Sequence, residues 1–257
     1  MIPSDLVKYK KDDQKIIALT AWDSISGSIV EEAGSDIVLI GDSLAMVSLG
    51  FKTTLPVTLE NMIDHTNSVC RGFHKRLDAQ PLVVCDMPFL SYHCGEDMAV
   101  EHAGKIIKET PAKAVKLEGA EPEIQAVISR LIRMGIPVMG HLGLTPQNYL
   151  NQGLKKQGES ILDQERIKKE SLILEKLGCF SLVLEHIPDL LAKEIKENLI
   201  IPVIGIGAGN FCDGQVRVTA DLIGLSDKQP PFCDPIIEGK KIFTDKLKDW
   251  VKAERLN

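Results

Sequence analysis

The feature of this sequence that most restricts its fold is a regular alternation of short apolar segments with amphipathic helical patterns. Eight apolar segments have the length and the Val, Ile and Leu content of buried parallel strands; they span residues 15–22, 36–42, 82–88, 114–119, 136–143, 181–186, 201–207 and 221–225. The helical patterns span residues 23–32, 58–72, 95–109, 121–134, 163–177, 188–197, 213–218 and 235–252. Eight such units in 257 residues predict an α/β protein with a closed (β/α)8 barrel, the TIM barrel. An open doubly wound sheet is the alternative.

No internal repeat or low-complexity linker divides the chain, so we expect one domain over residues 1–257. It has an N-terminal lead-in at about residues 1–14 and a C-terminal helix at about residues 235–252. Two connections, residues 47–57 and 143–160, are longer than a strand–helix loop requires. Long loops at the carboxyl ends of barrel strands usually act as lids, so we expect these two to cover a site.

Charge and hydropathy argue against two classes of partner. The formal net charge is −6, with 30 Lys and Arg against 36 Asp and Glu, whereas a nucleic-acid surface needs clustered basic residues. No run of 18 apolar residues is present, so we expect no membrane span. The polar N-terminus lacks the apolar core of a signal peptide, and the six cysteines form no Cys-x-x-Cys pair. A cytoplasmic protein with reduced thiols is therefore expected.

The fourth apolar segment, residues 114–119 (AVKLEG), carries Lys116 and Glu118 two positions apart. In a strand this spacing directs both charged side chains to one face and Val115 and Leu117 to the other. An internal ion pair would explain the two charges, although such a pair adds little stability. A strand that ends in an active site would also explain them, with Glu118 at a metal and Lys116 at an anionic substrate. The segment alone leaves both interpretations open.

Acidic residues also follow the neighbouring strands. Asp42, Asp86, Glu118 and Glu185 each end an apolar segment, and His141 lies at the end of the fifth. A single acid is a weak signal, because an acid after a strand often caps the next helix. Four acids at the same end of successive strands would meet where barrel enzymes place their catalytic groups. Three of them (Asp42, Asp86 and Glu118) offer only oxygen ligands, which suit Mg²⁺ better than zinc.

Glu185 and His141 each have two interpretations. Glu185 follows the apolar residues 182–184, so desolvation is expected to raise its pKa and make it a competent base. The alternative is that Glu185 is an N-cap, since Pro188 opens the next helix two residues later. His141 is expected to hydrogen-bond a ligand or substrate oxygen, and the alternative is a buried structural histidine. The turn at residues 205–210 (GIGAGN) does not match a dinucleotide fingerprint. It either lets the backbone approach an anion or is a tight turn that needs positive φ.

Seven motifs, in order between about residues 20 and 221, carry a resemblance to a known family. They are IGDSLAM (40–46), TLPVT (54–58), CDMPFLSY (85–92), VKLEG (115–119), PVMGHLGLTPQ (137–147), LVLEHIP (182–188) and PVIGIGAGNFCDGQV (202–216). GHLGLTPQ and PVIGIGAGN are highly specific, whereas GDSL alone is not. The sequence resembles the ketopantoate hydroxymethyltransferases, enzymes of pantothenate synthesis that transfer a one-carbon unit from methylenetetrahydrofolate to 3-methyl-2-oxobutanoate.

The resemblance implies a (β/α)8 barrel, bound Mg²⁺, 5,10-methylenetetrahydrofolate as cosubstrate and a homo-oligomer, commonly a decamer. Asp42 and Asp86 match the magnesium-binding aspartates of the family, and Glu118 matches the acid of the same metal site. Glu185 matches the proton acceptor, which is expected to form a metal-stabilised enolate of the oxo acid. The positions that match contacts to the keto acid, or lie in the same active-site stretch, are Asp42, Ser43, Asp86, Lys116 and His141.

The sequence departs from the family pattern at several positions. Ala45 stands where glycine is usual, and residues 153–158 (GLKKQG, with Lys156) replace Gly-Tyr-Lys-Val-Gln-Gly. Ala220 stands where histidine is common, and residues 230–237 are atypical. None of these changes removes an expected metal ligand or the base. They bear on lid contacts, folate affinity and subunit packing more than on the reaction.

Three other functions stay open at this point. A Mg²⁺-dependent lyase or mutase of the phosphoenolpyruvate mutase–isocitrate lyase group would also use a barrel and an oxo acid, but its usual Lys-Lys-Cys-Gly-type loop is missing from the sequence. A Schiff-base aldolase would use Lys116 as nucleophile, which the adjacent acids disfavour. A non-catalytic binding barrel would be expected to have lost one of the acids, and all are present.

Overall fold

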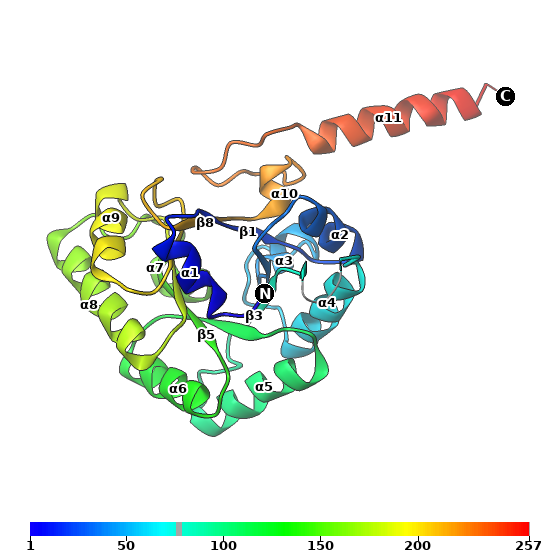
Figure 1. Ribbon diagram of the computed structural model, residues 1–257. Helices are drawn as coiled ribbons and strands as arrows, with labels where there is room; N and C mark the ends of the chain where they lie inside the picture. The colour runs from blue at the N-terminus through cyan, green and yellow to red at the C-terminus, as the bar shows by residue number, and fades with distance from the viewer. Residues whose placement is uncertain (76–78, 257) are drawn as a thin grey trace.

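The structure is a computed structural model that describes residues 1–75 and 79–256, and within that part of the chain eight parallel strands form a closed barrel (Figure 1). The strands are β1 (Ile16–Thr20), β2 (Ile37–Ile40), β3 (Leu82–Asp86), β4 (Ala114–Glu118), β5 (Val138–Gly143), β6 (Ser181–Glu185), β7 (Val203–Ile206) and β8 (Gly214–Arg217). Each strand pairs with the next, and β8 pairs in parallel with β1, where Val216 lies opposite Ala18. The predicted (β/α)8 barrel is confirmed, and the open sheet is excluded.

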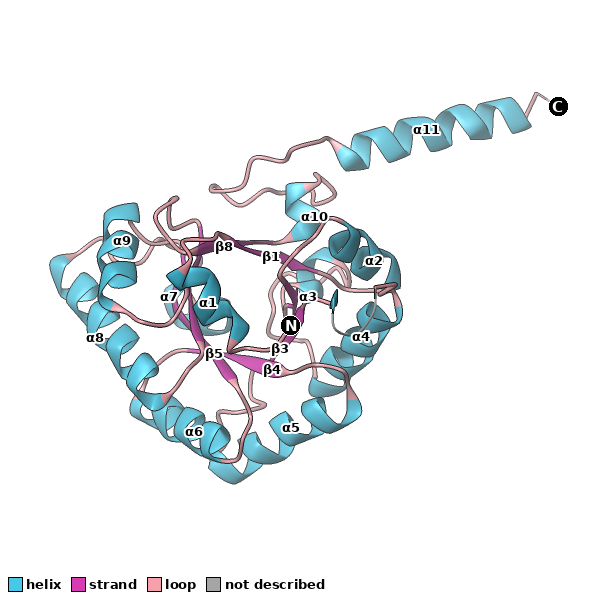
Figure 2. Ribbon diagram, viewed as in Figure 1, coloured by secondary structure: helices cyan, strands magenta, loops and turns pink. Residues whose placement is uncertain are grey.

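Helices form a ring outside the strands (Figure 2). The long ones are α2 (Ser24–Glu32), α4 (Leu59–Arg71), α5 (Glu96–Glu109), α6 (Pro122–Arg133), α8 (Ile161–Leu177) and α9 (Asp189–Asn198), as predicted within two residues. Local sequence fixes their ends: Asp23 and Thr58 start α2 and α4 in reciprocal capping boxes, and Gly178 ends α8 with φ of 102°. No helix among the described residues is long and apolar enough to cross a membrane.

Short helices lie in the connections: α1 (Asp5–Lys11), α3 (Leu44–Val47), the 3-10 turn η2 (Pro146–Asn148), α7 (Tyr149–Gln152) and α10 (Thr219–Leu222). The predicted lead-in at residues 1–14 therefore contains a helix, α1. The long connection at residues 143–160 contains η2 and α7 and runs over the carboxyl end of β5.

The prediction is wrong for the last strand–helix unit. Residues 213–218, expected to be helical, contain β8, and residues 221–225, expected to be a strand, contain the end of α10 and a turn. The strand was hidden because it is short and half polar: Gly214 and Val216 are buried, whereas Gln215 and Arg217 are only partly covered. The last helix, α11 (Gly239–Glu254), begins later than predicted and extends away from the barrel (Figure 1).

Alternate residues of each strand face the barrel interior, as the two-residue period of a strand requires. The apolar interior layers consist of Ile16, Ala18, Ile37, Leu39, Leu82, Val84, Ala114, Met139, Val183, Ile204, Ile206 and Val216. The other strand residues pack against the helices in a second, larger core. In β3, β4 and β5, the next inward-facing residue toward the carboxyl end of each strand is polar. These residues are Asp86, Lys116 and His141. The apolar layers thus form a floor beneath a polar barrel mouth.

The opposite end of the barrel is closed by α1, which carries a buried ion pair. Lys10 Nζ donates to three backbone carbonyls before β7, those of Lys196, Leu199 and Ile201. It also lies 3.0 Å from Asp213 Oδ2, which accepts from the backbone N–H of Val203 at 2.9 Å. Asp213 therefore joins α1 to the starts of β7 and β8.

Replacing Asp213 by Ala is expected to destabilise the protein by about 3–5 kcal/mol, because the ammonium of Lys10 and the N–H of Val203 would lose their buried partner. Denaturant unfolding followed by circular dichroism measures the change. Asp213→Asn is the matched control, since it keeps an acceptor for Val203 and should lose less. A loss below about 1 kcal/mol for Asp213→Ala would contradict this role.

Candidate active site

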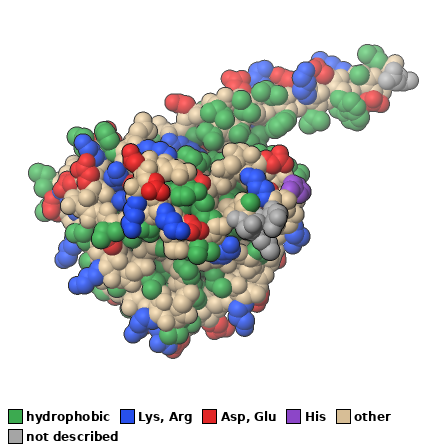
Figure 3. Space-filling model, viewed as in Figure 1, with side chains coloured by type: hydrophobic (Ala, Val, Ile, Leu, Met, Phe, Trp, Pro, Cys, Tyr) green, Lys and Arg blue, Asp and Glu red, His purple; other side chains and the backbone are tan. Residues whose placement is uncertain are grey.

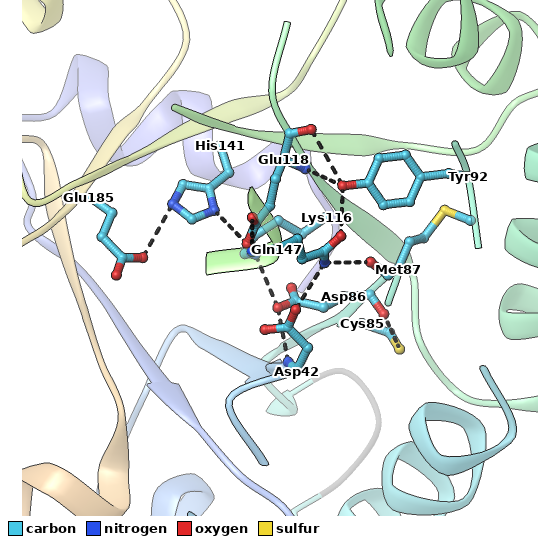
Figure 4. A network of polar contacts seen from close by, with 10 residues as sticks. All are labelled: Asp42, Cys85, Asp86, Met87, Tyr92, Lys116, Glu118, His141, Gln147 and Glu185. Carbon is cyan, nitrogen blue, oxygen red and sulfur yellow. Dashed lines mark hydrogen bonds and ion pairs between the residues drawn. The ribbon is translucent and has the colours of Figure 1, made fainter. Parts of the chain in front are cut away.

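The carboxyl ends of β2 to β6 bring the predicted site residues together (Figure 4). Asp42 lies two residues after the end of β2, and the other side chains come from β3 to β6. Asp42, Asp86, Lys116, Glu118 and His141 are each at most 5% exposed. Glu185 is less buried than its apolar strand suggested, with 16% of its side chain exposed. One buried cluster of four acids, a lysine and a histidine therefore lies at the barrel mouth.

Asp86 is the centre of one half of the cluster. Its Oδ2 lies 3.0 Å from Lys116 Nζ and accepts the backbone N–H of Asp42 at 3.1 Å. Its Oδ1 is buried and has no hydrogen-bond partner in the part of the chain that the structure describes. Lys116 Nζ lies 4.0 Å from Glu118 Oε1, so the predicted same-face arrangement of Lys116 and Glu118 is correct. Asp86 thus keeps one oxygen available for a ligand.

The pKa values of Asp42, Asp86 and Lys116 are raised in the cluster. For Glu118, the effect of burial is outweighed by contacts with His141 and Lys116, which lower its pKa. Burial, and then the charges of Asp86 and Glu118, raise the pKa of Asp42 to about 8. Burial also raises the pKa of Asp86, although Lys116 opposes the shift. Burial disfavours the ammonium of Lys116, but the neighbouring acids outweigh it and raise the pKa of Lys116. A bound cation would offset the burial and the neighbouring negative charges that raise the pKa of Asp42.

The donor set fits a hard divalent cation such as Mg²⁺. Such an ion commonly takes one or two protein carboxylates and fills its other positions with water or substrate oxygens. Asp42 and Asp86 offer that number, and Asp86 Oδ1 lacks a partner. Among the described residues, no three His, Cys, Asp or Glu side chains form a ready metal site. The cluster suits an ion held by two aspartates rather than by a complete protein cage.

Glu118 is held in place by other groups. Its Oε2 accepts the backbone N–H of Gln147 at 3.0 Å, and its Oε1 lies 3.3 Å from His141 Nδ1. Both oxygens therefore already have contacts, whereas Asp86 Oδ1 has no partner among the described residues. The role of Glu118 as a direct metal ligand stays a prediction, and its contacts connect it more closely to His141.

His141 lies between two carboxylates. Its Nδ1 faces Glu118, and its Nε2 lies 3.3 Å from Glu185 Oε2, although neither contact has good hydrogen-bond geometry. Burial and the charge of Lys116 lower the pKa of His141, but contacts with Glu118 and Glu185 outweigh them and raise it to about 9. The histidine can therefore carry a positive charge that faces the side chains of Glu118 and Glu185.

Two further residues organise the site and were missed from the sequence. Gln147 Nε2 donates to Asp42 Oδ2 and to the carbonyl of Met87, both at 2.9 Å. Tyr92 OH donates to Gln147 Oε1 at 3.0 Å and accepts the backbone N–H of Glu118 at 3.2 Å. Both lie in motifs that support the resemblance, CDMPFLSY and PVMGHLGLTPQ. An uncharged amide and a phenol give no charge pattern, so motif membership was the only signal.

The remaining predicted features lie at the edge of the cluster. Ser43 follows Asp42 at the start of α3, is half-buried and makes no capping hydrogen bond with its side chain. In the turn at residues 205–210, Gly207 and Gly209 have φ of 61° and 73°, and a Cβ on Gly207 would lie 2.6 Å from the ring of Phe232. The turn therefore needs these glycines for its backbone conformation, whatever else it binds.

Comparisons with known proteins agree on one family. A sequence model described as ketopantoate hydroxymethyltransferase matches residues 1–255. The 3-methyl-2-oxobutanoate hydroxymethyltransferase of Prochlorococcus marinus (strain AS9601) is 76% identical over 257 residues, which is 100% of both chains. The protein of the same name from Parasynechococcus marenigrum (strain WH8102) is 58% identical over 254 residues, 99% of this chain and 95% of that one.

Solved structures share the fold at low sequence identity. A phosphonopyruvate hydrolase in complex with oxalate and Mg²⁺ superposes with a TM-score of 0.62 at 10% identity, over 100% of both chains. A 2,3-dimethylmalate lyase of the PEP mutase/isocitrate lyase superfamily superposes with a TM-score of 0.59 at 14% identity, over 99% of this chain and 86% of that one. At such identities the likeness extends to the barrel architecture alone.

Proposed function

The chain belongs to the ketopantoate hydroxymethyltransferase family, and from this premise we propose that its buried cluster is the catalytic site. The chain forms ketopantoate by transferring a hydroxymethyl group to 3-methyl-2-oxobutanoate, a step of pantothenate biosynthesis. The observation that supports the placement of the reaction is the row of contacts from Asp86 through Lys116, Glu118 and His141 to Glu185, all at one barrel mouth. We further propose 5,10-methylenetetrahydrofolate as the one-carbon donor.

Asp42 and Asp86 would hold Mg²⁺, and Glu118 would stand beside it. When bound, the ion supplies a Lewis acid for the keto oxygen of the oxo acid. Lys116, already 3.0 Å from Asp86, offsets the negative charge that a substrate carboxylate adds to a cluster rich in acids. Ser43, half-buried beside Asp42, would donate to the same substrate. These groups orient the oxo acid above the apolar floor of the barrel.

Glu185 acts as the base in this proposal. Its carboxylate accepts the C3 proton of 3-methyl-2-oxobutanoate, and the electron pair of that C–H bond becomes the enolate. His141, 3.3 Å from Glu185 Oε2, stabilises the carboxylate before the proton arrives. The enolate carbon then bonds to the methylene carbon of the donor, water supplies the product hydroxyl, and tetrahydrofolate leaves. Proton transfer by a positioned base typically contributes about 10²–10⁴-fold to the rate.

Product analysis tests the function directly. The protein is incubated with 3-methyl-2-oxobutanoate, methylenetetrahydrofolate and Mg²⁺, and the products are identified by mass spectrometry. Ketopantoate is expected, and its absence would refute the assignment. A parallel incubation with 2,3-dimethylmalate tests the lyase alternative, and borohydride trapping with the oxo acid tests for a Schiff base on Lys116.

We also propose that the protein is a homo-oligomer, commonly a decamer in the family that it resembles. We propose that α11 makes a contact between the copies. This helix projects from the barrel (Figure 3). Gly239 is its only buried residue. One face exposes Phe243, Leu247, Trp250 and Val251, at 58%, 63%, 62% and 37% exposure. A contiguous apolar face of this kind marks an interaction surface. A second copy offers the same helix to it, so the contact can be symmetric.

Replacing Leu247 and Trp250 together by Glu is expected to shift the protein to smaller species. Two charges buried in an apolar contact should raise the dissociation constant of that contact by more than about tenfold. Sedimentation velocity over a concentration series measures the shift. Lys252→Glu, which changes charge on the opposite face of α11, is the matched control. An unchanged distribution in the double variant would exclude α11 from subunit contacts.

A further inference from the structure

The atypical segment at residues 230–237 returns to the barrel before α11 begins. Cys233 donates its backbone N–H to the carbonyl of Pro230 at 3.1 Å, which closes a turn. Pro231 is the second residue of this turn, a position that its fixed φ suits. The third residue, Phe232, packs against the apolar layers of the barrel interior. The segment thus delivers one aromatic ring to the barrel, and the proposed function leaves that ring without a role.

Two contacts hold the ring of Phe232 at the carboxyl ends of β6 and β7. The ring centroid lies 4.9 Å from that of the His186 imidazole, with the two rings inclined at 45°. The ring also lies against Gly207, where a Cβ would come within 2.6 Å of it. Because Gly207 has no side chain, the phenyl group can reach the backbone of the turn after β7. Phe232 therefore contacts the residues that directly follow both strands, next to Glu185 at the end of β6.

His186 connects Phe232 to two other parts of the barrel mouth. Its backbone N–H donates to the carbonyl of Ile206 in β7 at 2.8 Å, and its carbonyl accepts the N–H of Gln157 at 3.0 Å. Gln157 belongs to the long connection at residues 143–160, which was expected to act as a lid. His186 has φ of 48°, a strained conformation for a residue with a side chain, which persists only where the surroundings hold it. The contacts of its ring, N–H and carbonyl provide that support.

We propose that Phe232 and His186 form a clamp that positions Glu185 for proton abstraction and ties Gln157 to the end of β6. Glu185 directly precedes His186, so the turn at His186 sets the direction in which the chain leaves Glu185. The Glu185 carboxylate lies 3.3 Å from His141 Nε2, but this contact lacks good hydrogen-bond geometry, so the side chain depends on its backbone for position. The clamp rests on the proposed function, because it needs Glu185 to be the base. Phe232 acts through His186 and is a positioning residue.

Exchange of the C3 proton of 3-methyl-2-oxobutanoate in deuterium oxide, with Mg²⁺ and saturating oxo acid, tests the positioning of the base. Phe232→Ala and His186→Gly are each expected to slow exchange by about 10–100-fold, because a small displacement of a catalytic group is costly. The half-saturating concentration of the oxo acid should stay near the wild-type value. Glycine adopts positive φ freely, so His186→Gly removes the ring without opposing the turn.

The double variant shows whether the two rings act together. Phe232→Ala combined with His186→Gly should exchange no more slowly than the slower single variant, because both changes remove the same contact. Losses that multiply in the double variant would overturn the clamp, as would exchange at the wild-type rate in both single variants.

Two further variants separate the clamp from a general loss of structure. Phe232→Leu keeps an apolar side chain against Gly207 and should restore most of the exchange rate. Phe211→Ala is the matched control, since it removes a phenyl ring that is 42% exposed in the loop after β7, and it should exchange like the wild type. Equal losses in Phe232→Leu and Phe232→Ala would contradict a role for the apolar contact.

Hydrogen exchange of the backbone amides, followed by mass spectrometry, separates the clamp from the proposed function because it needs no reaction. Phe232→Ala should speed exchange of the Gln157 amide by about tenfold, the weight of one aromatic contact in a local opening, and leave peptides of α6 unchanged. An unchanged Gln157 amide would overturn the clamp. Wild-type protein that never exchanges the C3 proton would instead refute the base chemistry, and the Gln157 amide would then decide the clamp alone.

Discussion

Glu185→Gln is expected to slow exchange of the C3 proton of 3-methyl-2-oxobutanoate with deuterium oxide by about 10²–10⁴-fold. The amide has nearly the shape of the carboxylate but cannot accept a proton at neutral pH. It also loses the charge that faces His141 Nε2 at 3.3 Å. Exchange followed by proton NMR without the folate measures deprotonation alone, so the result does not depend on the identity of the one-carbon donor.

The control for this variant is Glu197→Gln, which replaces an exposed carboxylate on α9, the helix that follows β6. It should exchange at the wild-type rate. Circular dichroism spectra of both variants should match that of the wild type, since 16% of the Glu185 side chain is exposed and the change keeps its volume. Exchange by Glu185→Gln at the wild-type rate would remove Glu185 from the role of base.

The sequence was sufficient for the barrel because burial on both faces makes parallel strands almost wholly apolar. Against that background, Lys116 and Glu118 stand out, and the interior row of β4 places both at the mouth. The same regularity failed at β8, where Gln215 and Arg217 interrupt the pattern because no long helix packs over them. A strand that is only half buried has too weak a signal to separate from the short helix that was expected at residues 213–218.

The site was predictable only in part, because sequence order shows which residues reach the mouth but not which atoms meet. Asp86 and Glu118 look equivalent as acids at strand ends. In the fold, Asp86 Oδ1 has no partner among the described residues, whereas both oxygens of Glu118 do. That difference depends on Gln147, which reaches the cluster from the loop after β5. Contacts of this kind arise from loop conformation, which has no periodic sequence signature.

The difference between Asp86 and Glu118 leads to the second large expected effect. Asp86→Ala is expected to weaken binding of a divalent cation by about 100-fold or more, because it removes an oxygen without a competing partner and takes away the carboxylate that lies 3.0 Å from the ammonium of Lys116. Loss of a group that only orients a ligand typically costs about 10–100-fold. Binding of Mn²⁺ as a probe, followed by electron paramagnetic resonance with Mg²⁺ as competitor, measures affinity independently of turnover.

Glu118→Gln is the comparison that makes this result specific. The amide of the variant can still accept from the N–H of Gln147, so the position of Gln147 beside the cluster should persist. The loss of Mn²⁺ affinity should therefore stay near the lower end of about 10–100-fold. Equal losses in Asp86→Ala and Glu118→Gln would make Glu118 a direct ligand. Unchanged Mn²⁺ affinity and Mg²⁺-dependent activity in Asp86→Ala would exclude the two-aspartate site altogether. Because both side chains are at most 5% exposed, unfolding curves must accompany each titration, so that a lost site is distinguished from a lost fold.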